Sequence, residues 1–257
     1  MTDPVMVLGG HHVYNDYRDI PSDALADLAL LDSPWNTTGL GFDNDGFDIP
    51  EFARFVRARV KPTAWVFVFG TYRMAGIFDA LFDYRFEYIW VKPKGAYAPS
   101  AVRPARSHEI IWVFSGGARP GSLYFDKEAL RTRGEPYERH RDTNQMSEFK
   151  KSQGHPVSVH TSNDGWREGK TILEYPVKNM WPVRERTSHP TQKPLDMIRL
   201  FVRAYCKKGG IVLDPTLGSG TSLVAADMEG RTCIGAEINP DYQSIIGKRF
   251  NSMLHGG

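Results

Sequence analysis

The chain has 257 residues, 41% hydrophobic and 24% charged, which is long enough and apolar enough for one large globular α/β domain with an insertion. No apolar run approaches the about 20 residues that span a bilayer, and the first ten residues lack the basic start and apolar core of a signal peptide, so membrane insertion and secretion have no support. The net charge of +2 neither indicates nor excludes a polyanionic partner, and two cysteines, Cys206 and Cys233, fit reduced thiols in a cytosol-like compartment.

The first 23 residues show little periodicity. The pair His11 and His12 lies there, but no cysteine or carboxylate spacing completes a metal site, so we expect no metal. The apolar run 28–31 suits a buried strand, although residues 23–31 could equally form a short helix.

The following 90 residues alternate between helical spacing of apolar side chains and continuous β-prone runs. Continuous runs are typical of strands that are covered on both faces. In chain order, this pattern predicts a helix at 49–60, a strand at 64–69, a helix at 72–82 and strands at 86–91 and 109–114.

The pattern changes between 116 and 186, where turn residues are scattered and apolar runs are few. Residues 119–186 hold 13 basic and 10 acidic side chains, so this is the more basic part of a nearly neutral chain. Several aromatic residues argue that the segment folds at least in part. We interpret it as an insertion, either a solvated excursion or a nucleic-acid contact surface.

The last 70 residues are the most regular part of the chain. Apolar spacing after Pro194 predicts a helix that ends near 207. A buried strand at 211–214, a glycine loop at 215–221, a helix to about 229, a strand at 232–236 and a last helix from 241 follow.

An acid, a proline and a large flat ring stand together where the run 28–31 stops. If this run is a parallel strand, the acid lies at its carboxyl end, where open α/β sheets bind ligands. A carboxylate and a backbone carbonyl could accept hydrogen bonds from an amine, and the ring could stack on a base. The plainer interpretation is a turn after a strand. The four residues are Asp32, Ser33, Pro34 and Trp35.

The glycine loop indicates a nucleoside cofactor, because glycines let a ligand approach a helix N-terminus and an acid after the next strand accepts from ribose hydroxyls. ATP is disfavoured, since Gly220 is followed by Thr221 and no lysine. A dinucleotide would want glycine where Leu223 stands, and its acid about 20 residues on, whereas Glu237 follows Gly220 by 17. S-adenosylmethionine, which has a ribose but no pyrophosphate, fits at least as well, and a ligand-free helix entry is the plainer alternative.

These segments together resemble the amino-group DNA methyltransferases of the circularly permuted beta class. That family carries an Asp-Pro-Pro-Tyr-like tetrapeptide, a variable recognition region, His-Pro-Thr-Gln-Lys-Pro, Asp-Pro-Phe-x-Gly-Ser-Gly-Thr and an acid. Here the corresponding segments are 32–35, 189–194, 214–221 and Glu237, and 90–92 and 108–111 resemble minor landmarks. The match covers nearly the whole chain except 116–186. Serine replaces the first proline of the tetrapeptide, and tryptophan replaces its tyrosine.

The resemblance implies an α/β fold, a Rossmann-like class I methyltransferase sheet with helices on both faces, circularly permuted. It divides the chain into a catalytic half at 1–115, an inserted target-recognition region at 116–186 and a cofactor-binding half at 187–257. It implies methyl transfer from S-adenosylmethionine to the exocyclic amine of a flipped base, without a metal. The leading Asp32 favours adenine N6 over cytosine N4.

The resemblance also implies roles for residues. Asp32 and the Ser33 carbonyl would accept the N–H bonds of the amine, Pro34 would fix the turn, and Trp35 would stack on the base. The residues implied around the cofactor are Asp32, Thr191, Lys193, Asp214, Thr216, Gly218, Gly220, Thr221 and Glu237.

Double-stranded DNA is the implied partner, and a homodimer and a cognate restriction enzyme stay open. The implied location is the cytoplasm of a bacterium, at the nucleoid, in a protein encoded by the bacterium or a phage. Four alternatives remain: cytosine N4 methylation, a DNA-binding protein that keeps the fold without catalysis, an RNA or small-amine substrate, and a dehydrogenase, which Leu223 disfavours.

Overall fold

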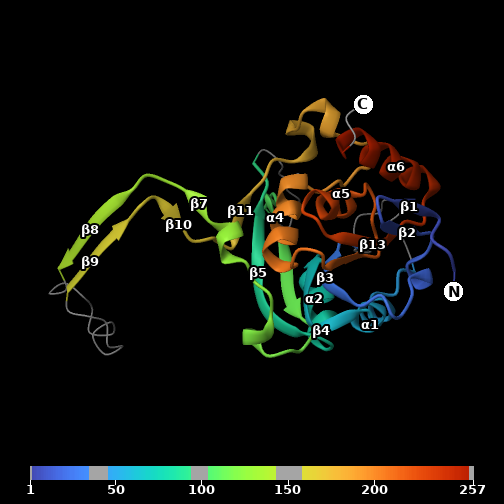
Figure 1. The fold of residues 1–257 in the computed structure, drawn as a ribbon, viewed down its shortest axis with the longest axis horizontal. Helices are drawn as coiled ribbons and strands as arrows, with labels where there is room; N and C mark the ends of the chain where they lie inside the picture. The colour runs from blue at the N-terminus through green and yellow to red at the C-terminus, as the bar shows by residue number, and fades with distance from the viewer. Residues whose placement is uncertain (1, 35–45, 94–103, 143–157, 255–257) are drawn as a thin grey trace. The chain divides into compact units, whose positions relative to one another are not determined.

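The computed structural model describes residues 2–34, 46–93, 104–142 and 158–254 (Figure 1). It divides into two compact units. The first unit consists of Met1–Asp126 and Thr171–Gly257, and the second unit is Lys127–Lys170. No helix in these ranges is long and apolar enough to cross a membrane.

The first unit is built on a nine-stranded mixed sheet in the order β1-β2-β13-β12-β3-β4-β6-β5-β11. The strands from β2 to β4 in that order are parallel to one another, whereas β6 is antiparallel to both β4 and β5. The strand bounds are β1 Met6–Leu8, β2 His11–Tyr14, β3 Ala26–Leu31, β4 Val60–Phe69, β5 Asp83–Val91, β6 His108–Ser115, β11 Ile172–Glu174, β12 Ile211–Asp214 and β13 Thr232–Ala236.

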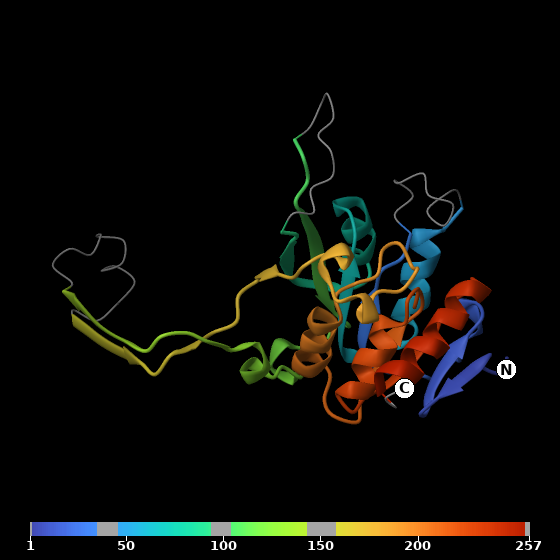
Figure 2. The same ribbon diagram turned by 90° about the horizontal axis from the view of Figure 1, so that it is seen from above.

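Helices cover both faces of this sheet, with α1 and α2 on one face and α4, α5 and α6 on the other (Figure 2). Their bounds are α1 Ile49–Arg57, α2 Tyr72–Asp79, α4 Leu195–Tyr205, α5 Thr221–Met228 and α6 Pro240–Leu254. Short 3-10 helices are η1 Tyr17–Asp19, η2 Pro120–Ser122, η3 Lys127–Leu130, η5 Lys178–Met180 and η6 Val183–Glu185.

Strand β3 shows why the central runs are apolar at every position. Ala29 and Leu31 belong to the core cluster under α1 and α2, and Leu28 and Leu30 are buried as well. A strand covered on both faces has no solvent side, so its sequence does not alternate. The strand interpretation of 28–31 is therefore confirmed, and the helical alternative is wrong.

Most predicted elements are present, with shifted ends. Helix α1 begins behind Asp48, whose side chain accepts from the Glu51 amide at 2.8 Å, and it ends at Arg57 because Val60 already starts β4. The second helix ends at Asp79, before the predicted position 82. Strands β12 and β13 have the predicted bounds.

The N-terminal hairpin of β1 and β2 was not visible as a periodic pattern. His11 in β2 is buried, donates from Nε2 to Asp227 Oδ1 at 2.9 Å, and accepts at Nδ1 from the Cys233 amide at 2.8 Å. The amide is a donor, so Nδ1 carries no hydrogen and Nε2 carries one. His11 thus joins the hairpin to β13 and α5.

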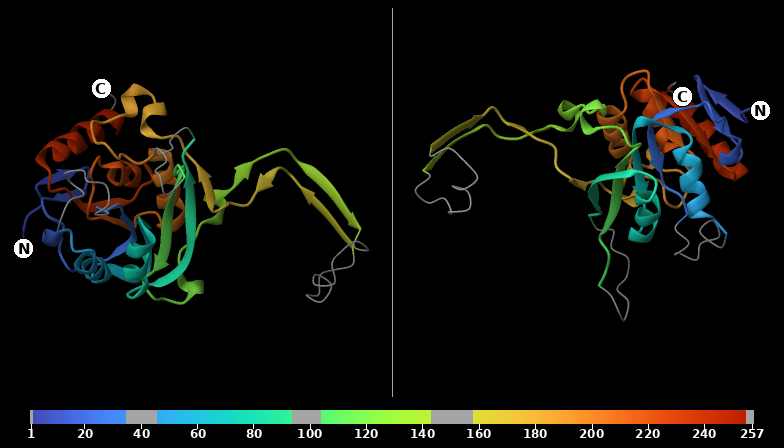
Figure 3. Two further views of the ribbon diagram at one scale, coloured as in Figure 1. Left: turned by 180° about the vertical axis from the view of Figure 1, so that it is seen from behind. Right: turned by 90° about the horizontal axis from the view of Figure 1, so that it is seen from below.

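The second unit consists of two short antiparallel pairs (Figure 3). Strand β7 (Thr132–Arg133) pairs with β10 (Trp166–Arg167), and β8 (Tyr137–Asp142) pairs with β9 (Ser158–Asn163). This unit lies inside the predicted insertion 116–186, whose outer parts belong to the first unit. On the C-terminal side, β11 extends the main sheet by pairing with β5.

Candidate active site

Three acidic residues stand at the ends of three neighbouring strands. Strands β13, β12 and β3 are adjacent and parallel, so their carboxyl ends open at the same edge of the sheet. Glu237 follows β13, Asp214 ends β12, and Asp32 follows β3. All three line one cavity of about 1010 Å³.

Most of the predicted site residues in the described part of the chain line this cavity. They are Asp32, Ser33, Pro34, Thr191, Lys193, Asp214, Thr216, Gly218, Thr221 and Glu237. Gly220 is not among the lining residues; it caps α5 with φ +72°, and a Cβ there would lie 3.1 Å from the Ile246 side chain. Trp35 lies outside the described residues.

Asp32 is held by an ion pair. Lys193 Nζ donates to Asp32 Oδ2, and the Asp32 side chain keeps 26% of its surface exposed. Burial raises the pKa of Asp32, while the charge and hydrogen bond of Lys193 lower it. Lys193 also lies 5.3 Å from the centre of the Phe69 ring. Lys193 therefore favours the ionised form of Asp32 and fixes one of its two oxygens.

The glycine loop is tied to Glu237. The Gly218 amide donates to Glu237 Oε2 and the Asn239 amide donates to Oε1, each at 2.8 Å. Burial raises the pKa of Glu237 even though these amides favour its charged form. Glu237 thus holds the loop from the neighbouring strand, an interaction that joins residues 19 apart in sequence.

Asp214 orders the start of the same loop by accepting from the Thr216 amide at 3.1 Å. Burial raises the pKa of Asp214 to about 7, against the hydrogen bonds of Ser222 and Thr216, which lower it. Below the loop, the buried Arg249 donates from Nη1 to Thr221 Oγ1 at 2.7 Å.

Sequence reasoning missed several residues around the cavity, among them Tyr17, Phe69, Glu109, His189 and Tyr242. His189 is buried against the edge of the Tyr242 ring, with the ring centres 4.4 Å apart. Burial and nearby cations lower its pKa to about 4, so it is neutral at pH 7. The motif at 189–194 could have indicated His189, and a charged residue near the start of an apolar strand could have indicated Glu109.

Three buried polar atoms of the cavity residues have no hydrogen-bond partner within the described part of the chain. They are Ser33 Oγ, Glu109 Oε2 and Thr216 Oγ1. Buried polar groups are almost always hydrogen-bonded, so such atoms in a cavity are suited to a ligand. In the same ranges, no group of three or more His, Cys, Asp or Glu residues could hold a metal ion.

A family model described as DNA methylase, covering N6 and N4 methyltransferases, matches residues 33–248. The chain belongs to this DNA methylase family. The resemblance to amino-group DNA methyltransferases drawn from the sequence motifs is therefore confirmed.

The chain is similar to curated type II methyltransferases. The chain is 27% identical over 166 residues to M.ScaI of Streptomyces caespitosus (65% of this chain, 50% of the relative) and 31% identical over 166 residues to M.SmaI of Serratia marcescens (65% and 46%). It is 27% identical over 261 residues to M.BglII of Bacillus subtilis (90% and 65%). The chain spans about half the length of the first two relatives.

Solved structures share the fold. The M1.HpyAVI–SAM complex matches with a TM-score of 0.56 at 22% identity, covering 88% of this chain and 89% of the other. PvuII DNA methyltransferase, cytosine-N4-specific, matches with a TM-score of 0.60 at 14% identity, covering 99% and 96%. The predicted class I methyltransferase fold is therefore confirmed.

Proposed function

We propose that this DNA methylase family member transfers a methyl group from S-adenosylmethionine to the exocyclic amine of a DNA base, and that the amine is N6 of adenine. The observation that carries the proposal is the meeting of Asp32 with Gly218 and Glu237 around one cavity. An acceptor suited to an amine and a loop suited to a nucleoside lie in the same space.

The loop side of the cavity fits the nucleoside part of S-adenosylmethionine. A carboxylate has about four acceptor sites, so Glu237 can accept from ribose hydroxyls while it holds Gly218 and Asn239. Thr216 Oγ1 is buried without a partner among the described atoms, and a ligand can satisfy it. Gly218, Gly220 and Thr221 shape the loop.

The charges around the cavity fit the rest of the cofactor. S-adenosylmethionine supplies a methyl group on a positively charged sulfur, and the acidic groups at the three neighbouring strand ends favour a cation there when they are ionised. We assign Thr191 and Lys193 to its methionine end. Lys193 then serves two partners, because its ammonium group also donates to Asp32.

The other side of the cavity fits the amine. The lone pair of an exocyclic amine is delocalised into the ring, so it must be localised before it can attack. Asp32 Oδ1 and the Ser33 carbonyl would accept its two N–H bonds, and these acceptors are in place before charge develops. S-adenosylmethionine, when bound, would supply the methyl group and keep the electrons of the broken C–S bond on its sulfur, while the amine nitrogen would form the new N–C bond and become positive. Asp32, whose pKa burial raises, can take the proton that the nitrogen then loses.

An amine paired inside duplex DNA cannot reach such a cavity, so we propose that the base is flipped out of the helix. Stacking of Trp35 on the flipped base stays a prediction from the sequence. Pro34, which directly precedes Trp35 in the sequence, lines the cavity.

The choice of adenine rests on the family resemblance, in which a tetrapeptide that begins with aspartate, as at Asp32, is more typical of adenine-N6 enzymes than of cytosine-N4 enzymes. Cytosine N4 is the second candidate, favoured by the fold similarity to a cytosine-N4-specific enzyme. Both bases present the same amine chemistry to Asp32. Mass spectrometry of nucleosides from DNA methylated by the protein separates the two products.

Double-stranded DNA is the proposed partner, and we propose that the second unit contacts it as part of the recognition region 116–186. Its side chains combine cations with aromatic faces: Arg133 lies 5.3 Å from the centre of the Trp166 ring, and Arg167 and Arg139 lie 4.8 and 5.4 Å from that of Tyr137. If Arg133 contacts a phosphate, its loss should weaken binding to all DNA sequences. The slope of the logarithm of the binding constant against the logarithm of salt concentration should then become shallower by about one unit.

The type II relatives suggest a bacterial protein that works with a restriction enzyme in the cytoplasm, and a homodimer fits the same proposal. A pull-down from lysate of the source bacterium tests for the restriction enzyme, and light scattering of the purified protein tests for the homodimer.

The function is tested with purified protein, tritium-labelled S-adenosylmethionine and genomic DNA that lacks base methylation. We expect label in DNA, and methylation-sensitive sequencing of the same DNA should then identify the site. Cofactor and DNA binding without any transfer would instead support the DNA-binding alternative.

A further inference from the structure

A second carboxylate reaches the cavity from the other half of the sheet. Strand β6 is antiparallel to β4 and β5, so β6 begins at the edge where β3, β4 and β5 end. Glu109 is the second residue of β6, and Lys92 directly follows β5. In the register, Ile111 pairs with Phe69, and Glu109 stands two residues before Ile111, so Glu109 and Phe69 share a face. Both line the cavity.

One carboxylate oxygen of Glu109 has a hydrogen-bond donor, and the other has none among the described atoms. Lys92 Nζ donates to Glu109 Oε1, and the two residues are only 8% and 7% exposed. Lys92 also lies 4.7 Å from the centre of the Trp90 ring, which fixes its direction. Glu109 Oε2 is buried and has no hydrogen-bond partner among the described atoms. Leaving a buried carboxylate oxygen without a donor is costly, which points to a donor supplied by a ligand.

The Lys92–Glu109 pair affects the pKa of Asp32. Burial and Lys193 have the largest effects on the pKa of Asp32; Glu109 then raises it and Lys92 lowers it. Asp32 and Glu109, each paired with a lysine, therefore line the same cavity, and each has one oxygen that its lysine does not occupy.

We propose that Glu109 is a second carboxylate that contacts the target base, with Oε2 accepting a hydrogen bond from the exocyclic amine beside Asp32, and that Lys92 is a positioning residue for Glu109. The inference rests on the proposed function. An amine offers two N–H bonds: Asp32 accepts one, and the Ser33 carbonyl and Glu109 Oε2 share the other.

The chemistry of a carboxylate makes Glu109 a specificity residue as well. An ionised carboxylate only accepts hydrogen bonds, so it attracts an amine and repels the carbonyl oxygen of guanine or thymine. Its charge also stabilises the positive charge that grows on nitrogen, which acts mainly in the transition state. Loss of the contact should therefore lower kcat more than it raises KM.

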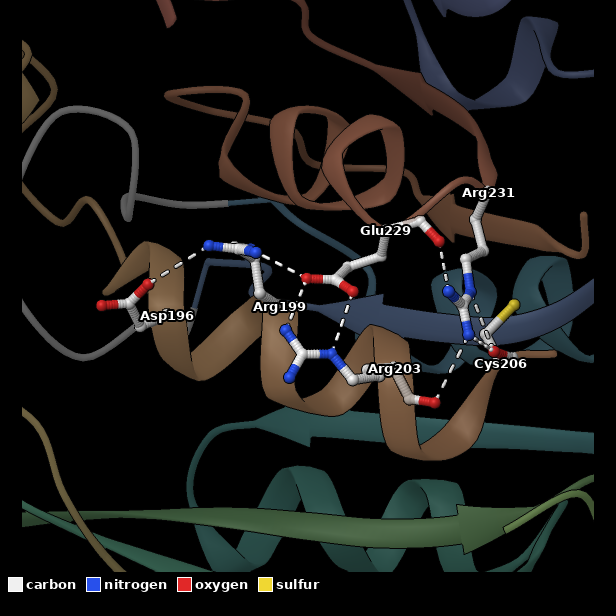
Figure 4. A network of polar contacts seen from close by, with 6 residues as sticks. All are labelled: Asp196, Arg199, Arg203, Cys206, Glu229 and Arg231. Carbon is white, nitrogen blue, oxygen red and sulfur yellow. Dashed lines mark hydrogen bonds and ion pairs between the residues drawn. The ribbon is translucent and has the colours of Figure 1, made fainter. Parts of the chain in front are cut away.

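The first test compares Glu109→Gln with Glu229→Gln. Glu229 is a glutamate whose side chain is 9% exposed, like that of Glu109, and it does not line the cavity. Two arginines hold it, with Arg199 Nε at 2.9 Å and Arg203 Nη2 at 2.8 Å from its Oε1 (Figure 4). We expect Glu109→Gln to lower kcat by about 10- to 150-fold, as for one hydrogen bond to a charged group, with cofactor affinity unchanged. Glu229→Gln should lower thermal stability and leave kcat within about twofold of the wild type, as is usual for a site remote from the chemistry.

The second test measures binding to two unmethylated DNA duplexes that contain the site on which the protein acts. One duplex carries the target base, and the other carries its deaminated analogue, hypoxanthine for adenine or uracil for cytosine. The wild type and Glu229→Gln should prefer the amine. In Glu109→Gln this preference should fall by about tenfold or more, because the glutamine amide can donate to a carbonyl oxygen. A purely structural role would leave the preference unchanged.

The outcomes separate the inference from the proposed function. A wild type without methyl transfer would defeat the proposed function. A wild type that transfers methyl, with Glu109→Gln equal to it in kcat and in base preference, would overturn only the role of Glu109. Should Glu109→Gln fail to fold, the double variant Lys92→Gln/Glu109→Gln replaces the ion pair by two amides of similar shape and takes the same two measurements.

Discussion

Replacing Gly218 by alanine tests most directly whether the conformation of the glycine loop at 215–221 is needed for stability and cofactor binding. Gly218 has φ +52°, a conformation that costs a residue with a side chain about 1–2 kcal/mol. The new Cβ would also lie 2.8 Å from His189 Nε2, which is closer than real Cβ contacts. His189 cannot simply turn away, because its ring packs on Tyr242 and its carbonyl accepts from Lys178 at 2.7 Å. This crowding adds about 1–3 kcal/mol, the usual cost of overpacking.

Gly209→Ala is the matched control. Gly209 has φ +74°, but a Cβ there would meet no atom within 4 Å. It should therefore cost only the backbone strain, about 1–2 kcal/mol, whereas Gly218→Ala should cost about 2–5 kcal/mol. In a chain of this size each kcal/mol lowers Tm by about 2–4 °C, so thermal unfolding resolves the difference.

Cofactor binding separates the two variants further. A shifted loop moves the Gly218 amide away from Glu237, which lies 2.8 Å from it in the native protein. We expect calorimetry with S-adenosylmethionine to show a loss of about tenfold or more for Gly218→Ala, as for one disturbed hydrogen bond to a charged group, and none for Gly209→Ala. Equal destabilisation and equal cofactor affinity in the two variants would refute the reasoning.

Three further changes probe the acids. Asp32→Asn should lower transfer of labelled methyl groups by about 10²- to 10³-fold, the usual cost of losing one preorganised group, while cofactor affinity stays within a few-fold; near-normal transfer would remove Asp32 from the mechanism. Glu237→Gln should weaken cofactor binding by about 1.5–3 kcal/mol in calorimetry, and unchanged affinity would contradict its role at the ribose. Burial raises the pKa of Asp214 to about 7, so the folded protein keeps a proton that the unfolded chain releases above about pH 4. The free energy of unfolding of the protein should therefore fall as pH rises from about 4 to 7. Denaturant unfolding should show a smaller fall for the Asp214→Asn variant.

The parts of the fold that the sequence predicts best are those where local pattern and burial agree. The runs 28–31, 64–69 and 211–213 are apolar because helices cover both faces of the sheet there, and all three runs lie in strands. Strand β2 gave no such signal, since its buried His11 is satisfied by Asp227, which is 216 residues away in sequence. The three-residue strand β11 is equally invisible, because its pairing with β5 makes it a strand.

The residues of the site also divide into those that a local sequence pattern predicts and those that depend on long-range contacts. Asp32 and Glu237 are predictable, because each follows an apolar run and parallel strands bind ligands at their carboxyl ends. The ion pair of Asp32 with Lys193 spans 161 residues, and no local pattern encodes it. Glu109 is the second residue of an antiparallel strand, so its place at the cavity follows only from the direction of β6 in the sheet.

The order of strands in the sheet, not their order in the chain, builds this site. Strands β12 and β3 are neighbours, with Val212 beside Leu28 and Leu213 beside Ala29, although about 180 residues separate them in sequence. The Asp32 half can therefore precede the glycine-loop half without moving either acid at the sheet edge. What the permuted order changes is the connection between the halves, which runs through β5, β6 and β11 and contains the second unit. A segment inserted there can vary in length and sequence while the three strand ends and their carboxylates keep their places.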